Sequence, residues 1–190
     1  MDMKSKKEMR KEMLKARDCL TQEEVRRCSE RICAVIAETE AYEKAGNICL
    51  YMPVRNEVEV TLMEKQARKD GKTLWIPKVE GEILTFYRWD EDMEMTTGSF
   101  GIREPGGSAA QPLTALTEQT PVLVIMPGTV FSERRDRIGY GGGYYDRFLT
   151  GRKNDRTIAV CYDFQIVKEL PAEAHDVRPD MIVSEKRMIK

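Results

Sequence analysis

The sequence predicts an α/β protein with a mostly parallel sheet, helices on both faces of that sheet, and a pair of helices at the N-terminus. From residue 47 onward, short apolar runs alternate with segments of helical composition, the pattern of βαβ units. Before residue 40, two helix-start signals precede segments rich in helix-favouring residues. The length of 190 residues suits one domain, so we expect a single unit over 1–190, with the helices of 1–40 packed on the α/β core.

The two N-terminal helices each begin with a capping box, in which a hydroxyl residue precedes a glutamate by three positions. Ser5 and Glu8 start the first helix, which continues to about residue 17 in a run rich in Lys, Glu, Met, Ala and Leu. Thr21 and Glu24 start the second, whose apolar stripe extends to about residue 39. We therefore expect two consecutive helices before the first strand.

The strands follow from short apolar runs and the residues that end them. Residues 47–53 and 73–77 are typical of buried strands ended by a proline. Residues 83–89 alternate in polarity, which favours an antiparallel or edge strand, and 122–128 form the most apolar run, which indicates a central strand. Two further strands are expected at 157–163 and 181–185.

The later helices are marked by caps and breakers. Thr61 with Glu64 predicts the start of a helix that Gly71 ends. Another helix is expected to begin near Tyr144 or Tyr145, after a glycine-rich stretch. Residues 107–121 favour a loop or a weak helical turn.

Charge and cysteine content argue against several classes of function. The 31 basic and 32 acidic residues give a net charge of -1, without the basic excess of a non-specific nucleic-acid binder. The five cysteines are odd in number and form no CxxC pair, so they signal neither a disulfide framework nor a zinc site. The chain shows no apolar leader and no run long enough to span a membrane. We expect a cytoplasmic protein without a membrane or nucleic-acid partner.

The stretch RDRIGYGGGYYDRFL, residues 135–149, predicts a phosphate-binding loop. Gly139, Gly141, Gly142 and Gly143 fall between a central strand and a helix, where open α/β sheets bind ligands. Glycines let backbone N–H groups approach an anion closely, and a helix N-terminus favours phosphate. Arg137 adds a permanent cation. The alternative is a plain strand-to-helix turn; neither GxxxxGK[ST] nor GxGxxG is matched.

Two groups of acidic residues are candidates for a magnesium site. Asp146 follows the glycine loop and can hold Mg²⁺ beside a phosphate, or can be an ordinary first-turn aspartate. His175, the only histidine, lies in HDVRPD with Asp176 and Asp180, where an aspartate can complete a Mg²⁺ shell. The sequence supports no Ser–His–Asp or Cys–His constellation.

Two further features have a functional and a plain interpretation. Lys6 and Arg10 are spaced i, i+4 on one helix face and can clamp a polyphosphate, although neighbouring lysines also fit a solvated basic face. Glu57, in PVRNEVEV after a strand, can accept N–H groups of a ring or an amide, or can be a loop carboxylate.

Taken together, these stretches resemble the 5-formyltetrahydrofolate cyclo-ligase (5,10-methenyltetrahydrofolate synthetase) family. The longest match is MPGTVFSERRDRIGYGGGYYDRFL at 126–149, and KKEMR, LYMPVRNEVEV, FGIREP and HDVRPD occur in the family's order over nearly the whole chain. The resemblance implies a three-layer α/β/α sandwich. It also implies a ligase of one-carbon metabolism that uses ATP and Mg²⁺ to close 5-formyltetrahydrofolate to 5,10-methenyltetrahydrofolate, releasing ADP and phosphate.

The resemblance also assigns residues. Lys6 and Arg10 match a basic pair on the nucleotide phosphates, Arg137 a third catalytic cation, and Asp146 and Asp176 the Mg²⁺ carboxylates. The implied ATP-binding positions are Lys6, Lys7, Glu8, Met9, Arg10, Arg137, Ile138, Gly139, Tyr140, Gly141, Gly142, Gly143, Tyr144 and Tyr145. The implied folate-binding positions are Met52, Glu57, Phe100, Tyr140, Gly141, Gly142, Gly143 and Tyr144.

The implied reaction suits these residue types. Phosphorylation of the formyl oxygen makes it a good leaving group, and N10 of the folate then attacks the formyl carbon, so no protein nucleophile is required. Phe100 departs from members that carry tryptophan there, but keeps an aromatic stack. We expect a monomer acting on 5-formyltetrahydrofolate, with or without a polyglutamate tail. The alternatives are a non-catalytic folate or nucleotide binder on the same scaffold, an ATP-dependent enzyme for another heterocycle, and a nucleic-acid-binding module.

Overall fold

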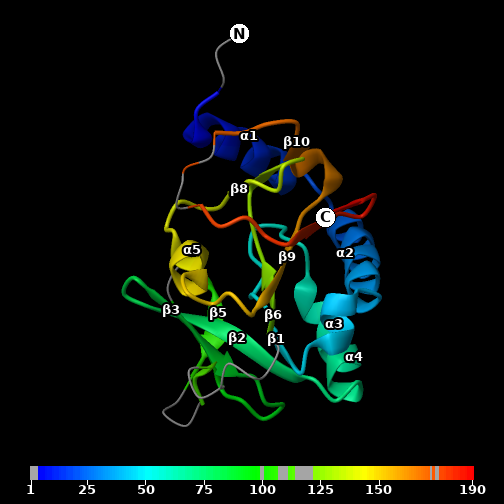
Figure 1. Cartoon of the computed structure of the whole chain (residues 1–190), viewed down its shortest axis with the longest axis vertical. Coiled ribbons are helices and arrows are strands. Elements are labelled where there is room, and N and C mark those ends of the chain that lie inside the picture. The colour runs from blue at the N-terminus through cyan, green and yellow to red at the C-terminus, as the bar shows by residue number, and fades with distance from the viewer. Residues whose placement is uncertain (1–3, 99–100, 107–110, 114–121, 172, 174–175) are drawn as a thin grey trace.

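A twisted seven-stranded sheet runs through the middle of the computed structural model, in the order β12-β11-β9-β6-β1-β2-β3 (Figure 1). The structure describes residues 4–98, 101–106, 111–113, 122–171, 173 and 176–190. The strands of this sheet are β1 Asn47–Cys49, β2 Thr73–Glu80, β3 Ile83–Arg88, β6 Val122–Met126, β9 Arg156–Val160, β11 Met181–Val183 and β12 Met188–Ile189.

The sheet is parallel in its centre and antiparallel at both edges. β2, β1, β6, β9 and β11 pair in parallel with their neighbours, whereas β3 and β12 are antiparallel. The chain moves from β1 outward to β2, returns to β6 on the other side of β1, and then moves outward through β9 to β11. The order therefore reverses between β1 and β6, and ligands of open α/β sheets bind beyond the carboxyl ends of strands at such a point.

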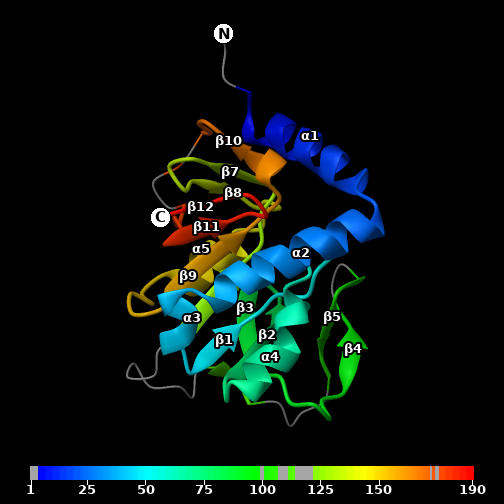
Figure 2. The ribbon, with the colours of Figure 1, turned by 90° about the vertical axis from the view of Figure 1, so that its right-hand side faces the viewer.

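Helices cover both faces of the sheet, which confirms the predicted three-layer sandwich (Figures 1 and 2). Ile48 and Leu123 pack in the buried cluster beneath α2, whereas Cys49 and Val124 belong to the cluster that contains α5, because successive side chains of a strand point to opposite faces. The helices are α1 Lys6–Asp18, α2 Gln22–Ala37, α3 Glu40–Lys44, α4 Glu64–Lys69 and α5 Tyr144–Leu149, with 3₁₀ turns η1 Val60–Met63 and η4 Asp163–Gln165.

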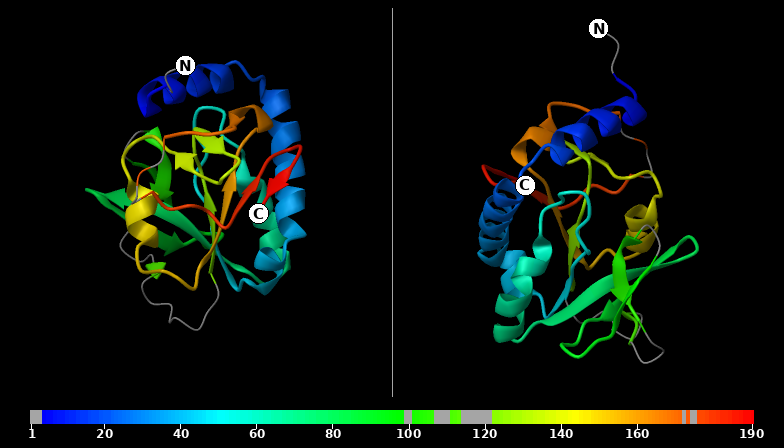
Figure 3. Two further views of the ribbon diagram at one scale, coloured as in Figure 1. Left: turned by 45° about the horizontal axis from the view of Figure 1, so that its top comes forward. Right: turned by 180° about the vertical axis from the view of Figure 1, so that it is seen from behind.

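Two smaller sheets complete the fold. β7 Val130–Ser132 lies between β10 Ile166–Val167 and β8 Arg137–Ile138. α1 lies beside this small sheet, across the end of the molecule to which β6 leads (Figures 1 and 2). Figure 3 shows, from behind, the β2–β3 pair projecting to one side of the molecule, below α1. Beside β2 lies the antiparallel pair β4 Met95–Thr97 and β5 Arg103–Pro105.

Both predicted capping boxes at the N-terminus are confirmed. The hydroxyl oxygens of Ser5 and Thr21 accept hydrogen bonds from the N–H groups of Glu8 and Glu24, whose carboxylates accept from the cap backbone in return. The second helix ends at residue 37, and Thr39 caps a separate short helix that the apolar stripe did not reveal.

Several predicted element boundaries are wrong. The first strand, expected to reach the proline at residue 53, ends at Cys49. The helix expected to start at Thr61 begins instead as the 3₁₀ turn η1, and α4 follows without a side-chain cap. Pro77 does not end its strand but lies inside β2, paired with Phe86. β1 pairs with β2 only as far as Trp75. On the β1 side of Pro77 there is therefore no strand that would need a hydrogen bond from the N–H that proline lacks.

The structure also refines the path into the glycine loop. The central strand predicted at 122–128 is present but ends at Met126, and the hairpin β7–β8 lies between that strand and the glycines. The alternating run at 83–89 is an edge strand, as predicted. Of the segment 107–121, only 111–113 are described, and Pro112 forms a bridge with Tyr87. Within the described part of the chain, no helix is long and apolar enough to cross a membrane.

Candidate functional site

The candidate site lies at the carboxyl ends of β1 and β6, where the strand order reverses. The segment after β1 carries Glu57, and the segment after β6 leads through the β7–β8 hairpin to the glycine loop. α1 contacts β7 and covers this end of the sheet. Three separate parts of the chain therefore meet at one edge.

Glu57 is a buried carboxylate with one unsatisfied oxygen. The side chain is 5% exposed, and its Oε2 accepts the backbone N–H of Val54 at 3.0 Å. Its Oε1 is buried and has no hydrogen-bond partner among the described residues. Burial raises the pKa of Glu57, against the opposing influences of the Arg17 charge, the Val54 N–H and the Tyr140 hydroxyl. Such an orphaned acceptor is suited to an N–H donor from a ligand.

The turn that presents Glu57 has an unusual backbone. Arg55 and Asn56 both have positive φ angles, of 49° and 54°, which non-glycine residues seldom adopt. The side-chain amide of Asn56 donates to the carbonyls of Arg17 and Leu20 at the end of α1, at 3.2 and 3.0 Å. The turn is thereby tied to the last turn of α1 and to the connection that follows it.

Arg17, which the sequence analysis did not select, is the buried cation of this region. It is 1% exposed, and its NH1 lies 3.7 Å from Oε1 of Glu57. Its guanidinium donates to the carbonyls of Arg55 and Gly128 and to the hydroxyl of Tyr140. The sequence carries one signal of this position, since Arg17 lies seven positions after Arg10 and hence on the same face of α1.

Arg137 and Asp146 flank the glycine loop and form an ion pair. The NH2 group of Arg137 donates to the two carboxylate oxygens of Asp146 at 3.1 and 3.2 Å, and its NH1 donates to the carbonyl of Pro127. Arg137 is 8% exposed, and its Nε is buried without a partner among the described residues. The guanidinium also lies 5.8 Å from the centre of the Tyr145 ring. A buried donor is thus left for an anion.

The glycine loop uses conformations and spaces that side chains would obstruct. Gly141 has a φ of +105°, and a Cβ there would lie 3.5 Å from NH2 of Arg10. Gly143 has a φ of +64° and is the residue that begins α5. Tyr140 is 44% exposed, but burial of its hydroxyl group, followed by the charge of Glu57, raises its pKa to about 12. The hydroxyl is therefore a neutral hydrogen-bonding group at physiological pH.

Lys6 and Arg10 project from one face of α1 toward this loop and toward the C-terminal segment. Nζ of Lys6 lies 2.8 Å from Asp176 and 2.9 Å from Glu173. Burial acts to lower the pKa of Lys6, but the hydrogen bonds to Asp176 and Glu173 raise it overall. Nε of Arg10 donates to the carbonyl of Gly139 at 2.7 Å. The predicted basic pair thus faces the site rather than solvent alone.

The residues between this pair have other roles in the ligand-free chain. Lys7 and Glu8 are exposed, and Glu8 is engaged in the capping box. Met9 packs with Met13 against the cluster of Val130, Ile138 and Leu170. Their predicted part in ATP binding stays a prediction.

The other predicted folate positions are partly outside the described residues. Met52 is half-buried after β1, and Tyr144 is half-buried at the start of α5, where Arg147 lies 5.1 Å from its ring centre. The hydroxyl of Tyr145 is buried without a partner in the described part of the chain. Phe100 and His175 lie outside the described residues.

The segment that carries Asp176 is hydrogen-bonded to Asp146, although the two predicted metal carboxylates come from distant parts of the chain. The backbone N–H of Val177, the residue after Asp176, donates to Asp146 at 3.0 Å. No cluster of three or more His, Cys, Asp or Glu side chains suited to a metal occurs among the described residues. Mg²⁺ is usually held by one or two carboxylates together with phosphate oxygens and water, so this pair fits a metal that arrives with a phosphate ligand.

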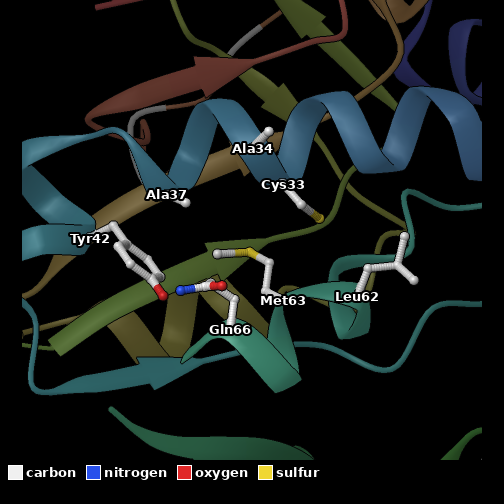
Figure 4. A pocket seen from close by; sticks show the side chains of 7 residues that line it. All are labelled: Cys33, Ala34, Ala37, Tyr42, Leu62, Met63 and Gln66. Carbon is white, nitrogen blue, oxygen red and sulfur yellow. The ribbon is translucent and has the colours of Figure 1, made fainter. Parts of the chain in front are cut away.

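A small apolar pocket lies elsewhere, between α2, α3 and the η1–α4 segment (Figure 4). Cys33, Tyr42 and Met63 are among its walls, and none of the seven side chains in Figure 4 carries a charge at neutral pH. Burial raises the pKa of the Cys33 thiol to about 12, so it is a protonated, inert group. This pocket lacks the cations and orphaned polar atoms of the carboxyl-edge site, which is therefore the candidate functional site.

The fold and the converging cations define an α/β protein with an anion-receptive site at a topological switch point, and comparison with known proteins identifies its family. The family model described as the 5-formyltetrahydrofolate cyclo-ligase family matches residues 2–185. A probable 5-formyltetrahydrofolate cyclo-ligase of Schizosaccharomyces pombe is 30% identical over 174 residues, covering 84% of each chain. The 5-formyltetrahydrofolate cyclo-ligase of Haemophilus influenzae is 28% identical and aligns over 93% of this chain and 96% of its own.

Solved structures agree with this relationship. The 5,10-methenyltetrahydrofolate synthetase of Aquifex aeolicus, determined by NMR, superposes with a TM-score of 0.81 at 34% identity, over 96% of this chain and 91% of that one. The Mycoplasma pneumoniae 5,10-methenyltetrahydrofolate synthetase, at 22% identity and a TM-score of 0.75, shares the fold. The chain belongs to the 5-formyltetrahydrofolate cyclo-ligase family and is an enzyme of the ligase class.

Proposed function

We propose that the protein closes 5-formyltetrahydrofolate to 5,10-methenyltetrahydrofolate, with ATP converted to ADP and phosphate. The observation that carries the proposal is the meeting of two kinds of binding group at one sheet edge. Three cations surround a glycine loop, and a buried carboxylate with an open oxygen lies beyond it. The first set suits a nucleotide polyphosphate, and the second suits the N–H groups of a pterin.

ATP is assigned to the cations of α1 and the glycine loop. Lys6 and Arg10 come from one helix face, and Arg137 comes from β8. Arg137 is the strongest candidate for contact with the transferred phosphoryl group, because its buried Nε has no partner among the described residues. Arginine also keeps its charge at any physiological pH.

Mg²⁺ is assigned to Asp146 and Asp176. In the ligand-free chain the cations Arg137 and Lys6 hold these carboxylates. When bound with the nucleotide, Mg²⁺ would supply charge neutralisation at the phosphate oxygens. The two cations would then exchange their carboxylate partners for phosphate, so binding of nucleotide and release of the carboxylates are coupled.

Folate is assigned to the side of the site where Glu57 lies. Its free Oε1 can accept an N–H of the pterin and orient the ring. Tyr140 interacts with Glu57, and we assign Met52, Tyr144 and the predicted stacking residue Phe100 to the apolar and aromatic surface that would contact the folate. A bicyclic ring with N–H donors suits this environment better than a sugar or a peptide does.

The proposed reaction needs orientation and charge stabilisation more than a protein nucleophile. The formyl oxygen of the folate receives the phosphoryl group and becomes a leaving group. N10 then forms a bond to the formyl carbon, which closes the five-membered ring, and loses its proton. The C–O bond to the phosphate breaks, and departure of the phosphate leaves the carbon–nitrogen double bond of the methenyl product. The cations stabilise the charge that develops on the transferred group, and Glu57 holds the folate so that the reacting atoms stay aligned.

Absorbance in the methenyl-folate band tests the proposal. Purified protein is mixed with 5-formyltetrahydrofolate and Mg²⁺, with and without ATP, and ADP is measured in parallel. We expect an ATP-dependent rise matched one-to-one by ADP. Binding of both ligands without a rise would favour the non-catalytic scaffold. ATP hydrolysis stimulated by a different heterocycle, with no folate product, would favour another substrate.

A further inference from the structure

We infer that Arg17 is a positioning residue for the folate side of the site, holding Glu57 and Tyr140 in fixed relation to one another. The inference rests on the proposed function, because it concerns the same site. Arg17 is neither a proposed ligand of the nucleotide nor a proposed ligand of the metal. It acts through two neighbours that come from different segments, one after β1 and one in the glycine loop.

The contacts of Arg17 join α1 to both of those segments. Its Nε donates to the carbonyl of Arg55 at 2.9 Å, two residues before Glu57. Its NH1 donates to the carbonyl of Gly128 at 3.3 Å, just after β6. Its NH2 donates to the hydroxyl of Tyr140. One planar group with fixed donor directions therefore sets the relative positions of three backbone segments.

The arrangement leaves Glu57 available for a ligand. NH1 of Arg17 lies 3.7 Å from Oε1 of Glu57, close enough for charge stabilisation but longer than a hydrogen bond. Oε2 is already occupied by the N–H of Val54. Arg17 thus favours the charged carboxylate while Oε1 keeps its capacity to accept a hydrogen bond.

Arg17 also fixes the hydroxyl of Tyr140 by donating a hydrogen bond to its oxygen. A tyrosine hydroxyl that accepts a hydrogen bond from a guanidinium retains its own proton for donation. The hydroxyl of Tyr140 also acts as a donor toward the Glu57 carboxylate. Once a ligand N–H takes that place at Glu57, Tyr140 can turn its proton to an acceptor of the same ligand. A pterin edge carries both kinds of group, so the pair held by Arg17 discriminates by the order of donors and acceptors along that edge.

The charged and titratable groups that face Glu57 come from four elements. They are Arg17 of α1, Tyr51 after β1, Tyr140 of the glycine loop and Tyr145 of α5. Burial raises the pKa of each of these tyrosines, and the charge of Glu57 raises it further, so the tyrosines stay neutral at physiological pH. Arg17 is the cation among these groups that stabilises the Glu57 carboxylate.

The test compares Arg17→Met and Arg17→Lys with wild type, with Arg26→Met as a matched control. Arg26 is an exposed helical arginine paired with Glu30, away from the site. Folate affinity is measured by calorimetry without ATP. We expect Arg17→Met to weaken folate binding by about tenfold or more, the effect expected for loss of a buried charge-assisted contact. Arg17→Lys should recover part of that loss, and the nucleotide Kd should change less than threefold, roughly 0.6 kcal/mol.

A double-mutant cycle with Glu57→Gln separates positioning from general loss of stability. If Arg17 acts through Glu57, removing its charge should matter much less in the Glu57→Gln background. An equal loss of folate affinity in both backgrounds would overturn the inference. Thermal unfolding identifies any variant that fails to fold. If Arg17→Met does not fold, Arg17→Lys carries the cycle instead, because it keeps the charge but loses the planar set of donors that positions Glu57.

A ligand-free measurement keeps the inference separate from the proposed function. The side-chain carboxyl of Glu57 is titrated by NMR, assigned by its disappearance in Glu57→Gln. Arg17→Met should raise the pKa of this carboxyl above its wild-type value, and an unchanged pKa would overturn the inference whatever the substrate is. A wild-type protein that binds folate and shows this coupling but forms no product would refute the proposed reaction and leave the role of Arg17 standing.

Discussion

Arg137 and Asp146 are nine residues apart, on opposite sides of the glycine loop, and the guanidinium contacts both carboxylate oxygens at 3.1 and 3.2 Å. The ion pair joins β8 to α5 and so fixes the two ends of the loop. Both partners are proposed to bind ligands, one the phosphate and the other the metal. The ion pair therefore holds the two ends of the glycine loop together until phosphate binds Arg137 and the metal binds Asp146.

Replacement of Arg137 by alanine should nearly abolish turnover. The transferred phosphoryl group would lose its buried cation, and loss of one such electrostatic contact lowers kcat by about 10²–10³. Steady-state kinetics of the ATP-dependent absorbance change measures the effect. Arg134→Ala is the matched control, because Arg134 is an exposed arginine of the β7–β8 turn paired with Glu169. A near-wild-type kcat/KM for Arg137→Ala would contradict the role.

Substitution of Gly141 by valine should weaken ATP binding while the protein stays folded. The φ of +105° is strained for any L-residue, and the side chain would enter the space beside Arg10. Calorimetry with ATP measures the change in affinity, and circular dichroism checks the fold. Gly151→Val imposes a similar strain at a φ of +84° but in open space. Equal ATP affinities for the two variants would show that the loop tolerates side chains.

Folate binding should depend on pH through Glu57. Because burial raises the folded-state pKa of this carboxyl, the charged form that accepts an N–H is fully present only above that raised value. Affinity should therefore be highest at neutral pH and should fall as pH decreases, starting at a higher pH than for an exposed glutamate. Calorimetric titrations from pH 8 to pH 5 measure this limb. Glu57→Gln should bind folate more weakly, and its affinity should not fall as the pH decreases. If the affinity of that variant falls over the same pH range, the titrating group is a different one.

The proposed metal carboxylates predict a specific change in Mg²⁺ dependence. Asp146→Asn should raise the Mg²⁺ concentration needed for half-maximal activity, since a neutral amide binds a hard cation more weakly than a carboxylate does. Removal of Mg²⁺ by a chelator should stop product formation in the wild-type protein. Asp90→Asn, at an exposed aspartate paired with Arg88, is the control. An unchanged Mg²⁺ requirement in Asp146→Asn would place the metal elsewhere.

Loss of the second capping box should affect stability without affecting chemistry. Thr21→Ala removes the side-chain acceptor for the N–H of Glu24 and should cost about 1 kcal/mol of unfolding free energy. Thr21→Ser keeps the acceptor and should restore most of that stability. Denaturant unfolding and the ATP-dependent assay are measured on both variants. A large loss of activity at unchanged stability would show that this helix start has a further role.

The regular elements could be predicted because their signals are local. Ser5 and Thr21 start helices through contacts within three residues, and the strand Val122–Met126 within the apolar run is buried on both faces of the sheet. Pro77 misled the prediction because its tolerance inside β2 depends on β1 being short. Thr61 misled it because a 3₁₀ turn occupies the expected cap. The two- and three-residue strands of the small sheet carry too little pattern to be recognised.

The glycine loop of the candidate site could be predicted from the sequence, whereas the buried residue Arg17 beside Glu57 could not. The glycines and Arg137 lie in one continuous stretch, so their composition alone indicates an anion site. Arg17 reads as one more charged residue on a basic helix, and only the tertiary structure shows that it is buried against Glu57. Arg17 is buried by contacts with Arg55 and Tyr140, which lie 38 and 123 positions further along the chain. No local sequence pattern indicates contacts over such separations.

The contact between Lys6 and Asp176 spans 170 positions, almost the whole chain. During synthesis, at about 5–20 residues per second, α1 emerges on the order of ten to thirty seconds before Asp176 does. Until then Lys6 lacks this partner, and the charged face of α1 is open to solvent and to other molecules. Assembly of the site is therefore a late event on the ribosome, and a nascent chain cut short before Asp176 would have the central strands but an incomplete site.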